Sequence, residues 1–538
     1  MKLIKIFLEY NFNVAADTLD YILQKDISEE ILHERIQKIP RDIPVITMKV
    51  LGEFLEPLDQ HLQPIKKRTE EVKTKMGRLV SEIPQNDEFD DDKITRSPPP
   101  ALKQLEKVIR PRVDRLPSLN ITVKLDIPER TSVKPDISEF MHLFQDRYDR
   151  LSRILLDNLN ESQQILKRYI PAEEASQVRN GILIGMVQDT RVLHTNKFVI
   201  HLEDPMSEIL TNCVMVEESK SFREYRDIIR DTVIGISGIL PKSFQGGDVT
   251  AFWGKDVIRP GFTPIKFTPS STHHRVLFVA DLHFGSKSFS RRVFAKLVNV
   301  LTGENLSPEN EVIAREIDTV VIAGDLVDGI GRFSAQKDQI SIHSLYTQYE
   351  NLTTLLEEIP SHIRIIVIPG EHDATQTAIP QPAIDKQIGE ALLSLPNLTS
   401  HGNPLRISIE GMNMLIFHGQ GTYTLFQKQF LDDQSNPALG IKHLLEYRHL
   451  CPEYGSFIPL APFKRDYLVI DEIPNVIVSG HLHQAHFEDY KGVKIIMCGT
   501  FKRDDQKTSA FGGNVSVGIV PVLDTVTGNV DMIDLKSQ

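Results

Sequence analysis

The sequence predicts a multidomain protein with a helical N-terminal module, an OB-type β-barrel and a final α/β (α+β) sandwich. First, the length of 538 residues suggests about three to four domains. Second, short apolar runs with internal glycines crowd residues 180–260, which is typical of a small barrel. Third, from residue 273 onward β-branched runs alternate with helical stretches at Ser290–Val300, Ser341–Glu357 and Ile384–Leu395.

The composition is ordinary for a globular protein. Hydrophobic residues make up 41% and charged residues 25% of the chain, and the net charge of −12 argues against nucleic-acid binding through overall charge. The net charge does not exclude a local basic groove. The three cysteines form no CxxC pair, which disfavours a zinc finger or disulfide framework and favours a reducing, cytoplasmic setting. We find no signal peptide and no apolar run long enough to cross a membrane.

Residues 1–58 are predicted to form the helical N-terminal module. Apolar residues such as Ala15, Leu19 and Leu23 recur there at helical spacing. Residues 59–135 are predicted to be a flexible linker, because they combine few aromatic residues with blocks of charge and a proline run at 98–100. We expect the module to recruit a partner and the linker to supply reach.

Residues 136–265 are predicted to hold one long helix followed by the OB-like barrel. Apolar residues from Phe140 to Leu155 step along one helical face. An OB barrel either binds single strands through aromatic residues or serves as packing. Aromatic residues are few here (Phe198, Phe252 and Trp253), so we favour packing and an interface over direct DNA binding. The five strands are expected at 182–187, 197–202, 213–216, 233–240 and 249–253.

Residues 266–538 are predicted to form the sandwich and to carry the functional site. Short β-branched runs of this kind are typical of buried strands, and each is followed by a candidate metal ligand. Ligands at the carboxyl ends of strands in one sheet converge on one crevice. The runs are 275–280, 319–323, 364–368, 414–417 and 475–479, and the residues after them are Asp281 and His283, Asp325, Glu371 to Asp373, His418, and His481 and His483.

The residue types favour a metal site without cysteine. In the patterns Asp281-x-His283 and His481-x-His483, alternate residues face the same way at a strand end. Imidazole and carboxylate together suit Mn²⁺, Fe²⁺ or Zn²⁺ better than an all-oxygen cage for Mg²⁺ or Ca²⁺. Two ions about 3.5–4 Å apart clamp a phosphate and acidify a water. Each of these short motifs alone is more often structural. Five of them at the ends of five predicted strands indicate a shared metal site.

These motifs resemble those of the calcineurin-like metallophosphoesterases. The resemblance spans about residues 273–500 and rests on Asp281-x-His283, Gly324-Asp325-x-x-Asp328, Gly370-Glu371-His372-Asp373, His418-Gly419 and Gly480-His481-x-His483. Together with the barrel, the tethered N-terminus and Pro380-Gln-Pro-Ala383, the whole chain resembles the small subunits of archaeal family D DNA polymerases. The active site of that family is similar to that of the double-strand-break repair nuclease.

The resemblance implies a role for each matching residue. Two divalent ions are expected, most simply Mn²⁺, with Fe²⁺, Zn²⁺ and Mg²⁺ as alternatives. The catalytic residues would be His372, which stabilises the transition state or protonates the leaving 3′ oxygen, and Asp328, which orients His372 through its carboxylate; Asp373 would support the loop. The first ion would bind Asp281, His283, Asp325 and His483, and the second would bind Asp325 as a bridge together with Glu371, His418 and His481.

One residue departs from the family pattern. The family usually has asparagine at the position of Glu371. Glutamate can still bind a metal, but its charge weakens the pull of the ions on the phosphate and raises the pKa of the water between them. The metal site is therefore predicted more firmly than the rate of the reaction.

Three functions compete. The first is a 3′→5′ proofreading exonuclease subunit, and the second, which is compatible with it, is an assembly subunit whose site is attenuated. The third is a free-standing metallophosphatase, which fits poorly because Gly329 stands where that class has an arginine and Arg332 is displaced. No polymerase motif is visible, so synthesis would belong to a large catalytic subunit. Other expected partners are DNA 3′ ends, touched by Lys502 and Arg503, and a sliding clamp or a primase at the N-terminal module.

Overall fold

A computed structural model gives the fold. Within its N-terminal unit, Met1–Pro100, only β1 (Asn13–Val14) and β2 (Val45–Ile46) are described, and they pair in parallel. The rest of the predicted helical module and most of the predicted linker lie outside the described residues. In the second unit, Ala101–Gln538, the structure describes residues 119–128, 136–159, 163–193, 197–205, 209–215, 228–304, 306, 308–332, 336–427, 436–503 and 515–537.

The long helix predicted before the barrel is confirmed as α7 (Ile137–Asn158). Its start is capped by Asp136, whose side chain accepts a hydrogen bond from the Ser138 amide. The buried positions are Leu143, Arg147, Leu151 and Leu155. An arginine in this stripe was not expected, because a charge at such a position is normally solvated.

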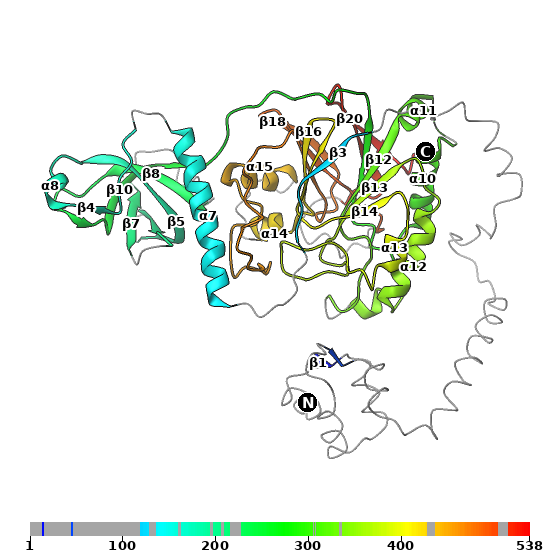
Figure 1. Ribbon diagram of the computed structural model, residues 1–538, viewed down its shortest axis with the longest axis horizontal. Helices are drawn as coiled ribbons and strands as arrows, with labels where there is room; N and C mark the ends of the chain where they lie inside the picture. The colour runs from blue at the N-terminus through cyan, green and yellow to red at the C-terminus, as the bar shows by residue number, and fades with distance from the viewer. Residues whose placement is uncertain are drawn as a thin grey trace, which may run out of the picture. The chain divides into compact units, whose positions relative to one another are not determined.

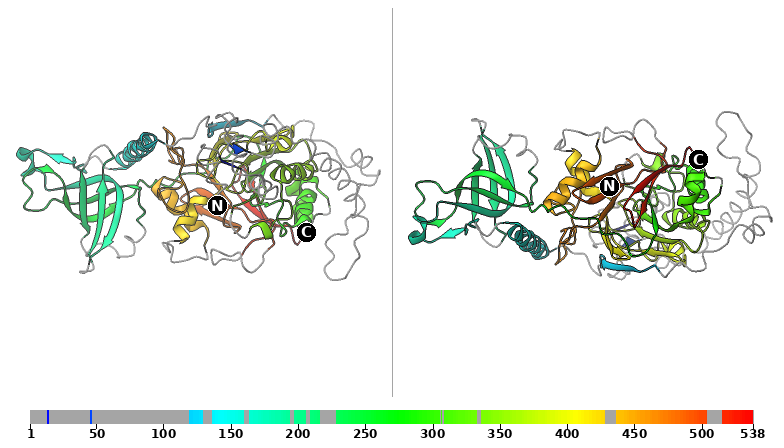
Figure 2. Two further views of the ribbon diagram at one scale, coloured as in Figure 1. Left: turned by 90° about the horizontal axis from the view of Figure 1, so that it is seen from below. Right: turned by 90° about the horizontal axis from the view of Figure 1, so that it is seen from above.

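The barrel closes in the strand order β10-β7-β6-β5-β8, and its strands match the five predicted runs. Strands β10 and β7 run parallel, and the other neighbours run antiparallel. Figures 1 and 2 show these strands wound around a common centre with α7 beside them. Phe198 and Phe252 are buried in the core, whereas Trp253 is 40% exposed. The bounds are β5 (Asn180–Val192), β6 (Phe198–Glu203), β7 (Leu210–Met215), β8 (Val233–Ile239) and β10 (Ala251–Ile258), with α8 (Ala172–Ala175), β4 (Tyr169–Ile170) and β9 (Gly247–Asp248) at one end.

The C-terminal part of the chain forms two six-stranded sheets packed face to face, and we call it the two-sheet domain. The first sheet has the order β14-β13-β12-β11-β20-β21, in which β11 to β14 run parallel. Apolar side chains from both inner faces, such as Phe278, Ile366 and Met414, form one core between the sheets. The bounds are β11 (Arg275–Val279), β12 (Ile317–Ala323), β13 (Arg364–Ile368), β14 (Leu398–Ser400), β20 (Ile519–Asp524) and β21 (Val530–Asp534).

The second sheet has the order β18-β19-β17-β16-β15-β3. Its edge strand β3 lies within the range predicted to be a linker, and it pairs antiparallel with β15. The alternation of apolar and polar residues in Ile121-Thr-Val-Lys-Leu125 is a strand signal that the composition of the surrounding segment concealed. The bounds are β3 (Ile121–Leu125), β15 (Leu405–Ile409), β16 (Met412–Ile416), β17 (Val476–Ser479), β18 (His486–Tyr490) and β19 (Val493–Met497).

Helices cover the outer faces of the two sheets, as Figure 1 shows. Two of the predicted helical stretches are confirmed as α10 and α12, but the stretch 384–395 forms only the short α13. Within the described ranges, no helix has the length and hydropathy of a membrane span. The bounds are α10 (Arg291–Thr302), α11 (Pro308–Arg315), α12 (Leu345–Leu356), α13 (Glu390–Leu393), α14 (Gln420–Gln427) and α15 (Ala438–Tyr447), with a 3₁₀ turn at Gln336–Asp338.

A buried ion pair links α7 to the two-sheet domain. Nε of Arg147 lies 2.7 Å from Oδ2 of Asp466, and both side chains are almost fully buried. The same carboxylate oxygen lies 2.8 Å from Nε2 of His449. Arg147 also donates to the carbonyl oxygens of Asp231 and Pro452. Charge compensation in this network offsets the desolvation of the buried groups.

Candidate metal centre

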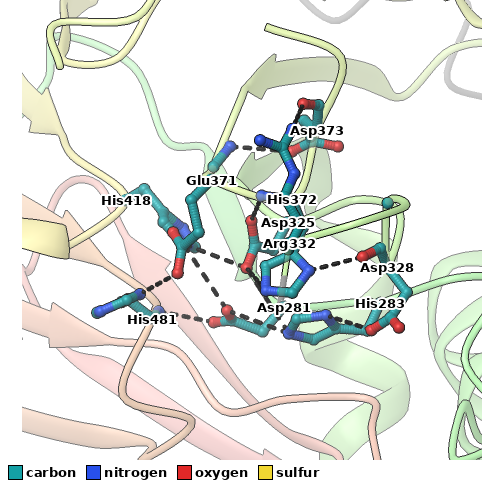
Figure 3. A network of polar contacts seen from close by, with 12 residues as sticks. Asp281, His283, Asp325, Asp328, Arg332, Glu371, His372, Asp373, His418 and His481 are labelled. Atoms are coloured by element: carbon teal, nitrogen blue, oxygen red, sulfur yellow. Dashed lines mark hydrogen bonds and ion pairs between the residues drawn. The ribbon is translucent and has the colours of Figure 1, made fainter. Parts of the chain in front are cut away.

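The predicted ligands meet at the carboxyl ends of five strands, but these strands belong to two sheets and not to one. Strands β11, β12 and β13 of the first sheet carry Asp281, Asp325 and Glu371, and β16 and β17 of the second carry His418 and His481. A short apolar run shows that a strand is buried but does not show which sheet it joins, so the sequence could not separate them. Figure 3 shows the side chains pointing toward a common centre.

The backbone at this centre is strained. Nine non-glycine residues in the described ranges have positive φ, and five of them are predicted ligands. Such conformations cost energy for residues other than glycine and concentrate at functional sites. This signal is invisible in sequence. The five are Asp281 (53°), His283 (49°), Asp325 (53°), His481 (69°) and His483 (58°).

The first cluster surrounds Asp281. Its Oδ1 lies 3.4 Å from Nε2 of His483 and 3.8 Å from Nε2 of His283. The two imidazole Nε2 atoms lie 3.1 Å apart. Asp281 and His283 are buried, and His483 is partly exposed. Three donor atoms facing one point within such distances can hold a metal ion.

The second cluster surrounds Glu371. Its Oε2 lies 2.9 Å from Nε2 of His418, and its Oε1 lies 2.9 Å from Nδ1 of His481. Burial opposes ionisation of Glu371, but the two imidazoles outweigh burial and lower the pKa of its carboxyl. These three residues form a second group with metal-ligand geometry.

Asp325 lies between the two clusters. Its Oδ2 is 3.7 Å from Nε2 of His283 and 3.5 Å from Nε2 of His418. Burial and Glu371 would raise the pKa of Asp325, but His372 and His418 outweigh them and lower it. A buried carboxylate between two imidazoles is the arrangement that a bridging ligand requires.

Glycines let the ligands approach one another. A Cβ at position 324 would lie 2.4 Å from Nδ1 of His418, and a Cβ at position 370 would lie 2.2 Å from Oδ1 of Asp325. Gly324 also has a φ of +93°. Gly324 therefore serves both the turn and the close approach, whereas Gly370 serves the close approach.

The predicted role of Asp328 needs a correction. Its carboxylate Oδ1 lies 3.0 Å from Nδ1 of His283 and does not hold His372. His372 is held instead by the main chain, since its Nδ1 lies 2.6 Å from the carbonyl oxygen of Asp328. The sequence placed Asp328 near both rings but could not tell a side-chain contact from a backbone contact. A carboxylate on the far nitrogen of a ligand imidazole orients that ligand.

The second ring nitrogen of His372, Nε2, faces the centre. Its amide donates to Oδ1 of Asp325 at 2.9 Å, and its Nε2 lies 3.9 Å from Oδ2 of Asp325. Burial would lower the pKa of His372, but the carboxylates of Asp325 and Glu371 outweigh burial and raise it. A partly exposed imidazole with a raised pKa can act as a proton donor.

Asp373 supports the loop, as predicted. It is fully buried and accepts hydrogen bonds from the amides of Leu326, Val327 and Gly370 and from the Tyr349 hydroxyl. Burial, with Asp325 nearby, raises the pKa of its carboxyl to about 6.

The two predicted DNA-binding residues differ in position. Lys502 is buried, and its Nζ lies 3.5 Å from Oδ1 of Asp328. Arg503 is exposed and donates to the carbonyl oxygen of Lys287. Burial would raise the pKa of Asp328, but His283 and Lys502 outweigh burial and lower it.

The residues present fit a metal. Oδ1 of Asp281 is buried and, among the described residues, has no hydrogen-bond partner. Buried polar atoms are normally satisfied, so a buried carboxylate oxygen that faces the centre without a hydrogen bond fits a metal ion. Nδ1 of His418 lies 2.7 Å from the Ala323 carbonyl oxygen, which leaves Nε2 as the coordinating atom.

Comparison with known proteins identifies the family. A family model that describes the B subunits of DNA polymerases alpha and epsilon matches residues 276–489. The DNA polymerase II small subunit of Methanothermobacter thermautotrophicus is 34% identical over 408 residues, which cover 74% of this chain and 80% of that protein. The chain belongs to the family of DNA polymerase II small subunits. The predicted resemblance to the small subunits of archaeal DNA polymerases is thereby confirmed.

Other relatives align with more of the chain, and some solved structures align with part of it. The DNA polymerase II small subunit of Archaeoglobus fulgidus is 29% identical over 520 residues, 95% of this chain and 94% of that one. A solved archaeal phosphodiesterase aligns with 48% of this chain and 98% of its own at 15% identity and a TM-score of 0.25. Zinc-bound Vps29 from Entamoeba histolytica aligns with 48% of this chain and 99% of its own at 14% identity and a TM-score of 0.21. Scores this low carry no conclusion about function.

Proposed function

We propose that this DNA polymerase II small subunit is a dinuclear-metal 3′→5′ proofreading exonuclease and the assembly platform for a large catalytic subunit. The observation that carries the nuclease role is the position of Asp325, a buried carboxylate shared by two imidazole–carboxylate clusters. Two-metal sites of this kind suit hydrolysis of phosphate esters. The proposal also places the chain in the metallophosphoesterase class and its barrel in the OB class.

The proposal assigns each ion its residues. Asp281, His283 and His483 would hold one ion, Glu371, His418 and His481 would hold the other, and Asp325 would touch both. This mixed nitrogen and oxygen donor set suits Mn²⁺, Fe²⁺ or Zn²⁺ better than Mg²⁺, and we expect Mn²⁺. When bound, the ions polarise the scissile phosphate and acidify the attacking water.

His372 would donate a proton from Nε2 to the leaving 3′ oxygen. The Asp328 carbonyl oxygen accepts a hydrogen bond from Nδ1 and so fixes the ring with Nε2 toward the centre. Asp328 would orient His283. We propose that Arg503 and the ammonium of Lys502 contact the phosphates of the bound strand.

The assembly role rests on the family and on the absence of any polymerase motif in the sequence. A small subunit implies a large catalytic partner, which we propose binds the barrel and the two-sheet domain. The N-terminal module would recruit a sliding clamp or a primase.

A second candidate, an attenuated assembly subunit, is favoured by one observation. Glu371 contacts the ligand atoms of both His418 and His481, so its charge competes with the ions for these imidazoles. A free-standing metallophosphatase has less support. The Arg332 guanidinium donates a hydrogen bond to the Asp373 carbonyl oxygen, a contact drawn in Figure 3, and the distance is 2.6 Å. This arginine therefore holds the loop and does not point freely into the centre.

The test is Mn²⁺-dependent digestion of single-stranded and mispaired 3′ ends by the full-length chain. We expect mononucleotide release that is lost in Asp325→Asn and kept in Glu311→Gln, an exposed carboxylate away from the site. Inactivity of the wild type with activity in Glu371→Asn would favour the attenuated subunit. Inactivity of both would overturn the nuclease role.

A further inference from the structure

An aromatic pair stands beside the second cluster. The ring of Tyr423, in α14, lies 6.0 Å from the ring of the ligand His481 and at 79° to it. On its other side, the Phe457 ring lies 6.0 Å away at 84°. Phe457 is 69% exposed, so most of its side chain is accessible from solvent. One exposed ring is therefore only two ring contacts away from a predicted metal ligand.

The segment around Phe457 is tied to the site, so the exposed ring does not sit on a remote loop. Helix α14 begins two residues after His418. The Thr424 hydroxyl lies 3.4 Å from the Ser456 hydroxyl, which also accepts from the Ile458 amide. A Cβ at Gly421 would lie 1.8 Å from the Leu450 carbonyl oxygen, so only glycine lets α14 pack this closely against the segment before Phe457.

The cationic side of the centre lies opposite. Lys502 contacts Asp328, while the aromatic pair adjoins His481. Figure 3 shows Asp328 and His481 on opposite sides of Asp325. A strand whose phosphates lie toward Lys502 and whose scissile phosphate lies at Asp325 would place its last nucleotide at Tyr423 and Phe457.

We propose that Phe457, backed by Tyr423, stacks the terminal nucleobase of an unpaired 3′ end and so selects single-stranded ends as substrate. This inference rests on the proposed nuclease function. Every base has a π-face, so a stacking ring accepts any terminal nucleotide, as removal of mismatches requires. A paired terminal base is held by hydrogen bonds to its partner and by stacking on the preceding pair, so it cannot reach the ring without melting. Phe457 is a positioning residue, because it holds the base and does not touch the reacting atoms.

The test compares oligonucleotides that end in a normal nucleotide with oligonucleotides that end in an abasic one. In the full-length chain with Mn²⁺, Phe457→Ala should raise KM for the normal end about tenfold and change kcat less than about twofold. KM for the abasic end should not change. Phe457→Trp should behave as the wild type, and so should Tyr169→Ala, which removes another exposed ring, on β4. Equal KM values for both ends in the wild type would overturn the proposal.

A second measurement needs no hydrolysis. A 3′-terminal 2-aminopurine, protected by a phosphorothioate linkage, should lose fluorescence on binding to the wild type and to Phe457→Trp but not to Phe457→Ala. Quenching without any nuclease activity would support the stacking role of Phe457 and overturn the proposed nuclease function. Activity without quenching would keep the nuclease and reject the stacking surface.

Discussion

Oε2 of Glu371 lies 2.9 Å from Nε2 of His418, the atom that would coordinate an ion in the proposed dinuclear site. Burial would lower the pKa of His418, but Asp325 and Glu371 outweigh burial and raise it well above its usual value. Without metal, these residues therefore form ion pairs in place of metal bonds. Binding of an ion at this cluster has to displace the proton from His418.

Manganese binding should therefore release protons and weaken as the pH falls. A folded-state pKa above the usual 6.5 keeps His418 protonated through neutral pH, so each step of acidification below that raised pKa favours the metal-free state. Calorimetric titration in two buffers of different ionisation enthalpy measures the released protons. An affinity that does not change between pH 6 and pH 8 would contradict the coordination of His418.

Glu371→Asn should reduce this proton release. The substitution removes the negative charge that helps to raise the pKa of His418, so less of the imidazole is protonated before the ion binds. We expect the proton count to fall and the hydrolysis rate at saturating Mn²⁺ to rise by about tenfold, since less negative charge opposes the phosphate. Glu311→Gln, which changes a surface carboxylate, is the matched control and should alter neither quantity.

Asp328→Asn should weaken metal binding and leave the His372 imidazole in place. The carboxylate orients His283, and loss of such a contact typically costs about 10–100-fold in metal affinity. His372 is held by the backbone carbonyl of the same residue, which the substitution keeps. The rate at saturating Mn²⁺ should therefore recover to within about threefold of the wild type. A rate loss that saturating metal does not repair would show that the carboxylate acts in the chemical step.

Much of this centre could be read from the sequence because its ligands follow strands. The apolar runs that precede Asp281, Asp325 and Glu371 predict buried strands, and the structure confirms these strands. The predicted ligands at their ends lie close together, as expected. Long-range pairing could not be read, because a run such as Val476–Ser479 carries no mark of its sheet. The left-handed backbone at the ligands and the contacts of Asp328 also depend on tertiary structure alone.

The pattern of α7 illustrates the same limit. Leu151 and Leu155 predict a buried helical face. The burial of Arg147 in that face is explained only by its ion pair with Asp466, which lies 319 residues away. A local sequence window contains one half of such a pair. A prediction from helical periodicity therefore places buried charged residues at the surface, where they do not lie.

Arg147→Ala should destabilise the protein strongly. The substitution leaves the Asp466 carboxylate buried without its main cation, which typically costs about 3–5 kcal/mol. Arg191→Ala, which removes the exposed partner of Asp189, should cost no more than about 1 kcal/mol. Midpoints of thermal unfolding measured by calorimetry compare the two variants. Similar midpoints would mean that the buried pair contributes no more than a surface pair.

Acid should destabilise the protein through His449. Burial and the nearby Arg147 lower the pKa of this imidazole to about 4, although Asp466 opposes them. The neutral ring suits its partners, since Nε2 can donate to Asp466 while Nδ1 accepts from the Cys451 amide. In the unfolded chain the ring takes up a proton near its usual pKa of 6.5. Between pH 6.5 and 4 the unfolded state therefore binds more protons, and stability falls as the pH falls.

The expected loss from His449 is about 2 kcal/mol between pH 7 and pH 5. His449→Gln keeps a donor for Asp466 but cannot take up a proton, so its stability should decline less over this range. His343→Gln, at an exposed histidine, should follow the wild type. Unfolding midpoints at the two pH values measure the difference. Parallel declines in the wild type and His449→Gln would show that acid acts on this protein through other groups.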